Sequence, residues 1–113
     1  RYAHDAGLAA GVRQKLRATP PPDWPDVEGM ARALRMPAST LRRRLRWEGQ
    51  SYRAICDELL RGLAQQALAN GRRSVADIAT DLGFAEPSAF HRAFRKWFDA
   101  TPAAYRRGIA RGA

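Results

Sequence analysis

The chain has 113 residues, of which 45% are hydrophobic, and its 20 Lys and Arg residues outnumber its 11 Asp and Glu residues to give a net charge of +9. That length fits one compact domain or two very small ones, and the positive charge predicts a polyanionic partner, either nucleic acid or an anionic membrane surface. The single cysteine excludes an internal disulfide, and the sequence contains neither an apolar run of membrane-spanning length nor a signal-peptide pattern.

The first 26 residues predict a linker and one helix. Residues 1–11 show little periodicity, which is typical of a linker or of the start of a helix. Val12 and Leu16 then share one face of a short helix over 12–18. Four prolines in residues 19–26 exclude the interior of a helix or strand, so we expect a stiff extended connection there.

Residues 27–50 predict two short helices joined by a turn. Apolar residues recur at helical spacing from Val27 to Leu34, with Asp26 as the N-cap. A second helix follows Pro37 and ends near Gly49. Its inward residues are expected to be Leu41 and Leu45, and its remaining surface is expected to carry Arg42, Arg43, Arg44 and Arg46.

Residues 51–71 predict a long central helix. Ser51 is the expected N-cap and Asn70-Gly71 closes the helix, which spans about 27 Å at 1.5 Å per residue. We expect Cys56 to fill space on this helix and not to act as a nucleophile, because no histidine lies near it in the sequence. The expected apolar stripe consists of Ile55, Leu59, Leu63 and Leu68.

Residues 72–108 repeat the earlier pattern and add a last helix. Ser74 begins a helix in the manner of a capping box, Gly83-Phe84 forms the turn, and Pro87 opens the next helix. The inward residues are expected to be Val75, Ile78, Ala79, Leu82, Phe90, Phe94 and Trp97.

Thr101 is expected to cap a short last helix that carries Tyr105 and ends by Gly108, followed by a tail over 109–113. From Val27 onward every segment has a helical period and none has the period of a strand. The predicted fold is therefore all-α, with two helix-turn-helix subdomains joined by the central helix and about seven helices in total.

The most specific pattern is an internal repeat with an offset of 48 residues, the distance from Val27 to Val75. The segment VEGMARALRM aligns with VADIATDLGF, so that the apolar positions of the two copies coincide. One residue is inserted in the second turn, after which Arg43 aligns with Arg92. The other aligned pairs are Ser39 with Ser88, Leu41 with Phe90, Leu45 with Phe94 and Arg46 with Arg95.

Each copy has the design of a helix-turn-helix. A small residue, Ala31 or Ala79, lies where the second helix must pack closely, and a tight turn follows. The second helix has inward positions one turn apart, which leaves its outer face free. Such a recognition helix fits a DNA major groove about 12 Å wide.

Two strings extend this pattern: SVADIATDLGFAEPSAFHRAFRKWF followed by TPAAYRR, and STLRRRLRWEGQSYRAICDEL. Through them the chain resembles the AraC family of bacterial transcription regulators from about Val12 to Arg107, and the second string is similar to the subgroup related to ornithine-utilisation regulators. The resemblance implies a seven-helix fold and a sensor domain that normally precedes this part. The chain begins with Arg1 and not with Met, so we expect the missing part to lie upstream.

The sequence departs from the family pattern in three places. The usual Ser at the cap before each recognition helix is Pro37 in one copy and Ala85 in the other, and each lost cap is expected to cost about 0.5–2 kcal/mol. Arg35 stands where the second copy has Gly83, and a left-handed conformation would strain Arg35 by about 1 kcal/mol. Asp99 replaces the frequent Gly after the last recognition helix.

The predicted DNA-binding residues lie on the outer faces of the two recognition helices. Arg43 is the candidate for a bidentate contact to guanine, which supplies about 1–3 kcal/mol of discrimination, and Arg92 corresponds to it by the repeat. The alternative is that the arginines form only a solvated helix face, that His91 is merely exposed and that Pro87 only begins a helix. The predicted set is Ser39, Thr40, Arg42, Arg43, Arg46, Pro87, Ser88, Ala89, His91, Arg92 and Arg95.

Adjacent acidic residues suggest ion pairs and not acid–base chemistry. Asp57 and Glu58 cannot face each other on one helix, so we expect them to orient the central helix against a recognition helix. We expect Asp77 and Asp81 to do the same in the second unit.

The histidines and aromatic residues also have simple interpretations. His4 and His91 are too few and too isolated for a metal site. Trp47 either packs on the central helix or lies exposed. A stacking platform for single-stranded nucleic acid is an alternative for the aromatic cluster, but its helical spacing favours a core. The cluster consists of Phe90, Phe94, Trp97, Phe98 and Tyr105.

The predicted function is sequence-specific binding of double-stranded DNA, with two recognition helices in successive major grooves. RNA polymerase and an upstream sensor domain of the same chain are the further expected partners, a membrane is not, and the expected location is the cytoplasm at the nucleoid. No cofactor and no enzyme activity is expected, because no nucleophile, base or metal cluster has suitable spacing. The alternatives are a non-specific architectural nucleic-acid binder and a helical module that meets an acidic partner or membrane.

Overall fold

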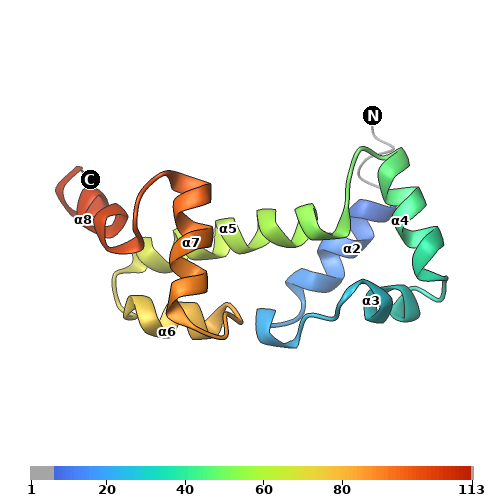
Figure 1. Cartoon of the computed structure of the whole chain (residues 1–113), viewed down its shortest axis with the longest axis horizontal. Helices are drawn as coiled ribbons and strands as arrows, with labels where there is room; N and C mark the ends of the chain where they lie inside the picture. Colours follow the sequence, from blue (N-terminus) through green and yellow to red (C-terminus); the bar gives the residue numbers. More distant parts are fainter. Residues whose placement is uncertain (1–6, 113) are drawn as a thin grey trace. The chain divides into compact units, whose positions relative to one another are not determined.

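In the computed structural model, which describes residues 7–112, every regular element is a helix (Figure 1). The predicted all-α class is therefore confirmed. The described chain divides into two compact units between Leu59 and Leu60, inside the longest helix. The elements are α2 (Leu8–Arg17), the 3₁₀ turn η1 (Pro21–Asp23), α3 (Val27–Ala33), α4 (Ala38–Trp47), α5 (Tyr52–Asn70), α6 (Val75–Asp81), α7 (Pro87–Phe98) and α8 (Pro102–Gly112).

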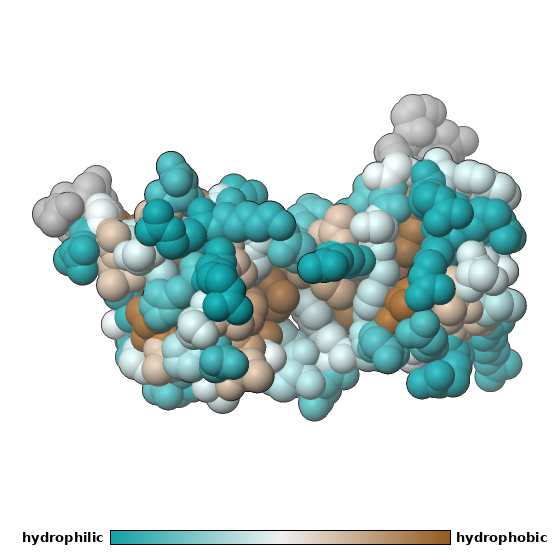
Figure 2. All heavy atoms as spheres, viewed as in Figure 1, coloured by the Kyte–Doolittle hydropathy of each residue, from teal (hydrophilic) through white to brown (hydrophobic). Residues whose placement is uncertain are grey.

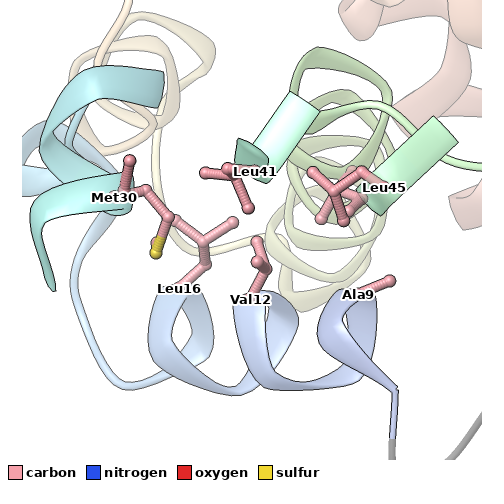
Figure 3. Close-up of a cluster of buried hydrophobic side chains, with 8 residues drawn as sticks. Ala9, Val12, Leu16, Met30, Leu41 and Leu45 are labelled. Atoms are coloured by element: carbon pink, nitrogen blue, oxygen red, sulfur yellow. The ribbon is translucent and has the colours of Figure 1, made fainter. Parts of the chain in front are cut away.

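The core of the first unit forms where α2, α3 and α4 meet (Figure 3). Leu41 and Leu45 of α4 are completely buried, as their spacing of one helical turn predicts. Val12 and Leu16 of α2 lie opposite them and are also completely buried. Because the two leucines occupy the inner face of α4, its arginines must lie on the outer face.

The core of the second unit contains an aromatic cluster. Phe90 and Phe94 of α7 are completely buried, and the ring centroid of Phe94 lies 4.7 Å from that of Phe98 and 5.4 Å from that of Tyr105. Completely buried rings cannot stack on nucleic-acid bases. The predicted role of these aromatic side chains as core is therefore confirmed, and the stacking platform is excluded for Phe90 and Phe94.

The predicted helix starts are confirmed by their hydrogen bonds. The Asp26 carboxylate accepts from the Gly29 backbone N–H at 2.8 Å, which satisfies a donor that the first turn of α3 leaves unpaired. The Ser51 hydroxyl accepts from Ala54 at 3.1 Å, and the Ser74 hydroxyl accepts from Asp77 at 3.0 Å.

Three predicted boundaries differ from the structure. The proline-rich segment is not wholly extended, because Pro21 begins η1; proline fits the first turn of a helix, where its missing N–H would be unpaired. The first helix begins at Leu8, before the expected Val12. The last helix continues past Gly108 to Gly112, since Gly108 does not adopt the positive φ that ends a helix.

The apolar stripe on α5 also differs at one position. Leu63 was expected to face inward, yet it is 37% exposed, and the neighbouring Ala64 is completely buried in the core of the second unit. Consecutive residues of a helix project about 100° apart, so Ala64 and Leu63 point in different directions. Ala64 belongs to the same buried cluster as Leu68 and Phe90.

The N-terminus of α2 is capped from another helix. Gly7, the N-cap residue, has no side chain to offer, and the carboxylate of Glu48 accepts from the backbone N–H groups of Leu8 and Ala9, both at 2.9 Å. Glu48 directly follows α4, so this contact joins the end of one predicted recognition helix to the start of α2. The negative charge also complements the positive end of the α2 dipole.

Replacing Glu48 by Ala is expected to lower the free energy of unfolding of the first unit by about 1–3 kcal/mol, because two charge-assisted hydrogen bonds are lost. Urea unfolding followed by circular dichroism measures this effect. Glu58→Ala is the matched control, since Glu58 is exposed and its ion pair with Arg13 should contribute at most about 1 kcal/mol. Equal losses in the two variants would contradict the capping role.

Candidate nucleic-acid interface

The turns before the two predicted recognition helices have the same backbone hydrogen bonds. Met36 N–H donates to the Ala31 carbonyl and Phe84 N–H donates to the Ala79 carbonyl, both at 3.0 Å. Between the partners of each bond, Arg35 has φ of 60° and Gly83 has φ of 88°. The left-handed conformation expected for Arg35 is thus present, and the strained arginine does not change the turn.

The outer face of α4 carries the arginines that the sequence predicted there. Arg43, Arg44 and Arg46 are exposed, and Ser39 is exposed one turn before Arg43. Thr40 is partly buried. Figure 2 shows strongly hydrophilic side chains over the visible surface of α4, with apolar residues between the elements. The charged face of this helix therefore does not fold into the interior.

Two arginines of α4 have partners within the first unit. Arg42 donates to the Glu28 carboxylate of α3 at 3.1 Å, and both side chains of this pair are about half exposed. The guanidinium of Arg43 lies over the indole of Trp47, 5.6 Å from the ring centroid. Of the two alternatives for Trp47, the exposed one is confirmed, since the side chain is 75% exposed. The partner role of Glu28 was not predicted, and neither was the contact between Trp47 and Arg43, although their spacing of four residues was a usable signal.

The start of α7 corrects one prediction. The N-cap is Glu86 and not Ala85, because Pro87 occupies the first helical position and holds the residue before it in an extended conformation. The Glu86 side chain does not cap the helix backbone; its carboxylate accepts from the Ser88 hydroxyl at 3.2 Å. Ser88 and Pro87 are both exposed.

The outer face of α7 has less internal pairing than that of α4. Arg92 and Arg95 are exposed and have no ion-pair partner among the side chains of residues 7–109. His91 is partly exposed, and its Nδ1 lies 2.8 Å from the Pro87 carbonyl, which requires Nδ1–H as the donor and leaves Nε2 outward. Ala89 is partly buried beside them.

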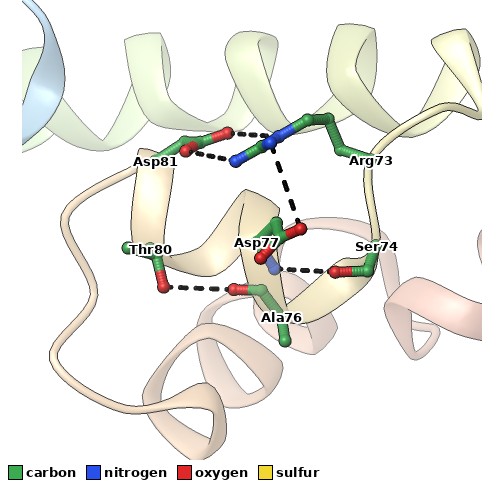
Figure 4. A network of polar contacts seen from close by, with 6 residues as sticks. All are labelled: Arg73, Ser74, Ala76, Asp77, Thr80 and Asp81. Carbon is green, nitrogen blue, oxygen red and sulfur yellow. Dashed lines mark hydrogen bonds and ion pairs between the residues drawn. The ribbon is translucent and has the colours of Figure 1, made fainter.

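Glu58, Asp77 and Asp81 pair with residues outside the two predicted recognition helices. Glu58 of α5 pairs with Arg13 of α2 at 3.1 Å. Asp81 of α6 accepts hydrogen bonds from Arg73, the shorter at 2.8 Å, and Asp77 forms an ion pair with Arg73 at 4.0 Å, because the i,i+4 spacing of the two aspartates places both carboxylates beside the loop that enters α6 (Figure 4). The hydrogen bonds that Arg73 donates to the Asp81 carboxylate raise the pKa of the Arg73 guanidinium, which stays charged. The arginines of α4 and α7 therefore do not donate to Glu58, Asp77 or Asp81.

Cys56 has the surroundings of a structural residue. It is half-buried against the core of the first unit, and burial raises the pKa of its thiol above the usual range. Burial also raises the pKa of the neighbouring Tyr52, whose hydroxyl donates to the Pro25 carbonyl. A thiol with a raised pKa is protonated at neutral pH and is a weak nucleophile.

Neither a metal site nor a membrane helix is found in the part of the chain that the structure describes. No three or more His, Cys, Asp or Glu side chains come together there in an arrangement that could hold a metal ion, and His4 lies outside the described residues. None of the described helices combines the length and apolar character needed to cross a bilayer.

The chain is similar to bacterial transcription regulators. A family profile described as "Helix-turn-helix domain" matches residues 30–108. The ornithine utilization regulator of Pseudomonas aeruginosa is 41% identical to the chain over 100 residues, which cover 88% of this chain and 29% of that protein. The chain thus spans less than a third of the length of this relative.

Two solved structures of transcription regulators are similar to the chain in fold. A DNA-binding transcriptional dual regulator from Escherichia coli K-12 superposes with a TM-score of 0.85 and 25% identity, covering 93% of this chain and 94% of that chain. The transcriptional regulator CdpR from Pseudomonas aeruginosa gives a TM-score of 0.71 and 36% identity, covering 74% of this chain and 27% of that one.

Proposed function

Because the chain belongs to the AraC-type helix-turn-helix family of bacterial transcription regulators, we propose that α4 and α7 read two sites in successive major grooves of one operator in double-stranded DNA. The proposal is supported by one observation: the outer faces of α4 and α7 both expose arginines, and each helix follows a turn with the same backbone hydrogen bonds. Such a pair of helices must meet grooves about one helical turn, or about 34 Å, apart on one face of the duplex.

In this proposal Arg43 and Arg92 read guanine, because the planar guanidinium donates two parallel hydrogen bonds to O6 and N7. Ser39 and Ser88 lie one turn earlier on the same outer faces and accompany the arginines at the base edges or phosphates. Thr40, His91, Pro87 and Ala89 complete the surface against the groove. Arg46 and Arg95 bind phosphates, which provide affinity independent of sequence, and Arg42 contacts a base or a phosphate in place of Glu28.

We also propose that this chain is part of a longer protein. The ornithine utilization regulator is more than three times as long as the stretch that matches, which leaves room for another domain. We propose that a sensor domain precedes the chain, that it controls DNA binding in the bacterial cytoplasm at the nucleoid, and that bound regulator acts on RNA polymerase.

Replacing Arg43 or Arg92 by Ala tests the base-reading role. We expect each variant to lose about 1–3 kcal/mol of discrimination, roughly 5- to 150-fold, at one guanine of an operator selected from a random DNA pool. Binding titrations with the selected operator and with single-base variants measure this loss. Arg44→Ala is the matched control, because Arg44 lies off the reading face and should affect all sequences equally.

The same titrations separate the specific function from the architectural alternative. A non-specific binder would enrich no sequence from the pool. Unrelated DNA would then compete for the protein as well as any other duplex does. If the two variants weakened binding to unrelated DNA as much as binding to the operator, their arginines would be phosphate contacts only.

A further inference from the structure

Trp47 is the most exposed of the large hydrophobic side chains in the described part of the chain. Its side chain is 75% exposed at the end of α4, and it lies outside the core of the first unit. In the alignment that pairs Arg46 with Arg95, the residue of the second unit that corresponds to Trp47 is Lys96. A charged residue is thus compatible with this position in the fold, and packing alone does not require an indole there.

The indole is placed to contact one particular arginine. The guanidinium carbon of Arg43 lies 5.6 Å from the ring centroid of Trp47, within the range of a cation–π interaction. Residues four apart share a helix face, and side chains lean toward the N-terminus of the helix, so the Trp47 ring lies back along the stem of Arg43. The contact therefore follows from the spacing of the two residues in α4.

An aromatic partner leaves Arg43 able to bind a base. The guanidinium carbon of Arg43 lies over the ring at 5.6 Å, and the ring offers no carboxylate oxygen to occupy the N–H donors. A carboxylate would use those donors, as Glu28 does with the neighbouring Arg42. A ring partner restricts the arginine without competing with guanine O6 and N7, so less conformational entropy is lost when the base is bound.

The second unit lacks this arrangement. Arg92, the counterpart of Arg43, has no partner among the side chains of residues 7–109, and Lys96 cannot offer it an aromatic face. The two units therefore present their central arginines differently, one held against a ring and the other free to move.

We propose that Trp47 is a positioning residue for base recognition: its indole holds the Arg43 guanidinium on the reading face of α4 and sharpens the discrimination of the guanine that Arg43 contacts. This inference rests on the proposed function, because it assigns the reading role to Arg43. It makes the first unit the more selective of the two and the second unit more dependent on phosphate contacts.

The test compares Trp47→Phe with Trp47→Leu, two side chains of similar size of which only one has an aromatic face. The readout is the ratio of affinities for the selected operator and for the operator altered at the guanine that Arg43→Ala identifies. We expect Trp47→Leu to lower this ratio by roughly 2- to 5-fold and Trp47→Phe to keep most of it. Thermal unfolding should be nearly unchanged, since the side chain is largely exposed.

A double-mutant cycle decides between action through Arg43 and an independent role. In the Arg43→Ala background, Trp47→Leu should have no further effect on the ratio. An equal effect in both backgrounds, or an unchanged ratio in Trp47→Leu alone, would overturn the inference while leaving the proposed function intact. If Arg43→Ala itself kept full discrimination, the reading role in the proposed function would be the part that fails.

Discussion

Raising the salt concentration from about 50 to about 200 mM is expected to weaken operator binding by about 100- to 1,000-fold. Seven exposed cations lie on α4 and α7, and Arg42 among them already has a carboxylate partner. If about four to six of the others and their neighbours contact phosphates, the slope of log affinity against log salt is about −4 to −5, because each neutralised phosphate releases counterions. Fluorescence anisotropy at several salt concentrations measures this slope.

Single charge removals give the matching control for the salt experiment. Lys96→Gln and Arg95→Gln should each make the slope shallower by about 0.9 and weaken binding to operator and unrelated DNA alike. Arg73→Gln should leave the slope unchanged, because Arg73 is already paired with Asp81 and Asp77. Affinity that did not respond to salt would exclude phosphate-driven binding and with it the proposed role of these cations.

Replacing Phe94 by Ala is expected to lower the free energy of unfolding of the second unit by about 3–5 kcal/mol. Phe94 is completely buried, and its ring contacts those of Phe90, Phe98 and Tyr105, so truncation leaves a cavity in the only aromatic cluster of the described residues. Small domains have about 5–15 kcal/mol of stability in total, so this loss removes much of it. Urea unfolding with amide hydrogen exchange measures the loss and locates it.

The location of the loss matters as much as its size. Phe94 belongs to the core of the second unit, whereas Leu41 and Leu45 belong to that of the first, so Phe94→Ala should leave amide protection in α3 and α4 nearly unchanged. Base discrimination through Arg43 should then survive and discrimination through Arg92 should be lost. Leu63→Ala is the control on α5, since that side chain is 37% exposed and its truncation should cost little. Unfolding of both units together would show that they are one cooperative body.

Local rules explain why much of the fold could be predicted. Helix faces follow from a period of 3.6 residues, and the starts at Asp26, Ser51 and Ser74 follow from side chains that reach an amide three residues away. The repeat added a long-range comparison, which located the two turns and identified Arg43 and Arg92 as counterparts. These signals involve residues close in the chain, or two copies of one pattern, so they need no knowledge of packing.

The candidate interface could be predicted as a face but not as a set of contacts. The outward positions of Arg43, Arg46, Arg92 and Arg95 follow from the buried positions between them. The pairing of Arg42 with Glu28, 14 residues away, depends on how α3 packs on α4. The roles of these residues toward DNA remain predictions for the variants described above.

The order of the amino acids was sufficient to predict the all-α class, the buried faces of α4 and α7 and the left-handed turn at Arg35. Three-dimensional packing alone established that Glu48 caps α2, that Ala64 and not Leu63 enters the core, and that Asp77 and Asp81 bind Arg73. The difference is physical: helix period and capping act over one or two turns, whereas these contacts depend on which helices meet and at what angle. Which of two neighbouring side chains is buried, and which charged partner a carboxylate binds, therefore depends on contacts between helices.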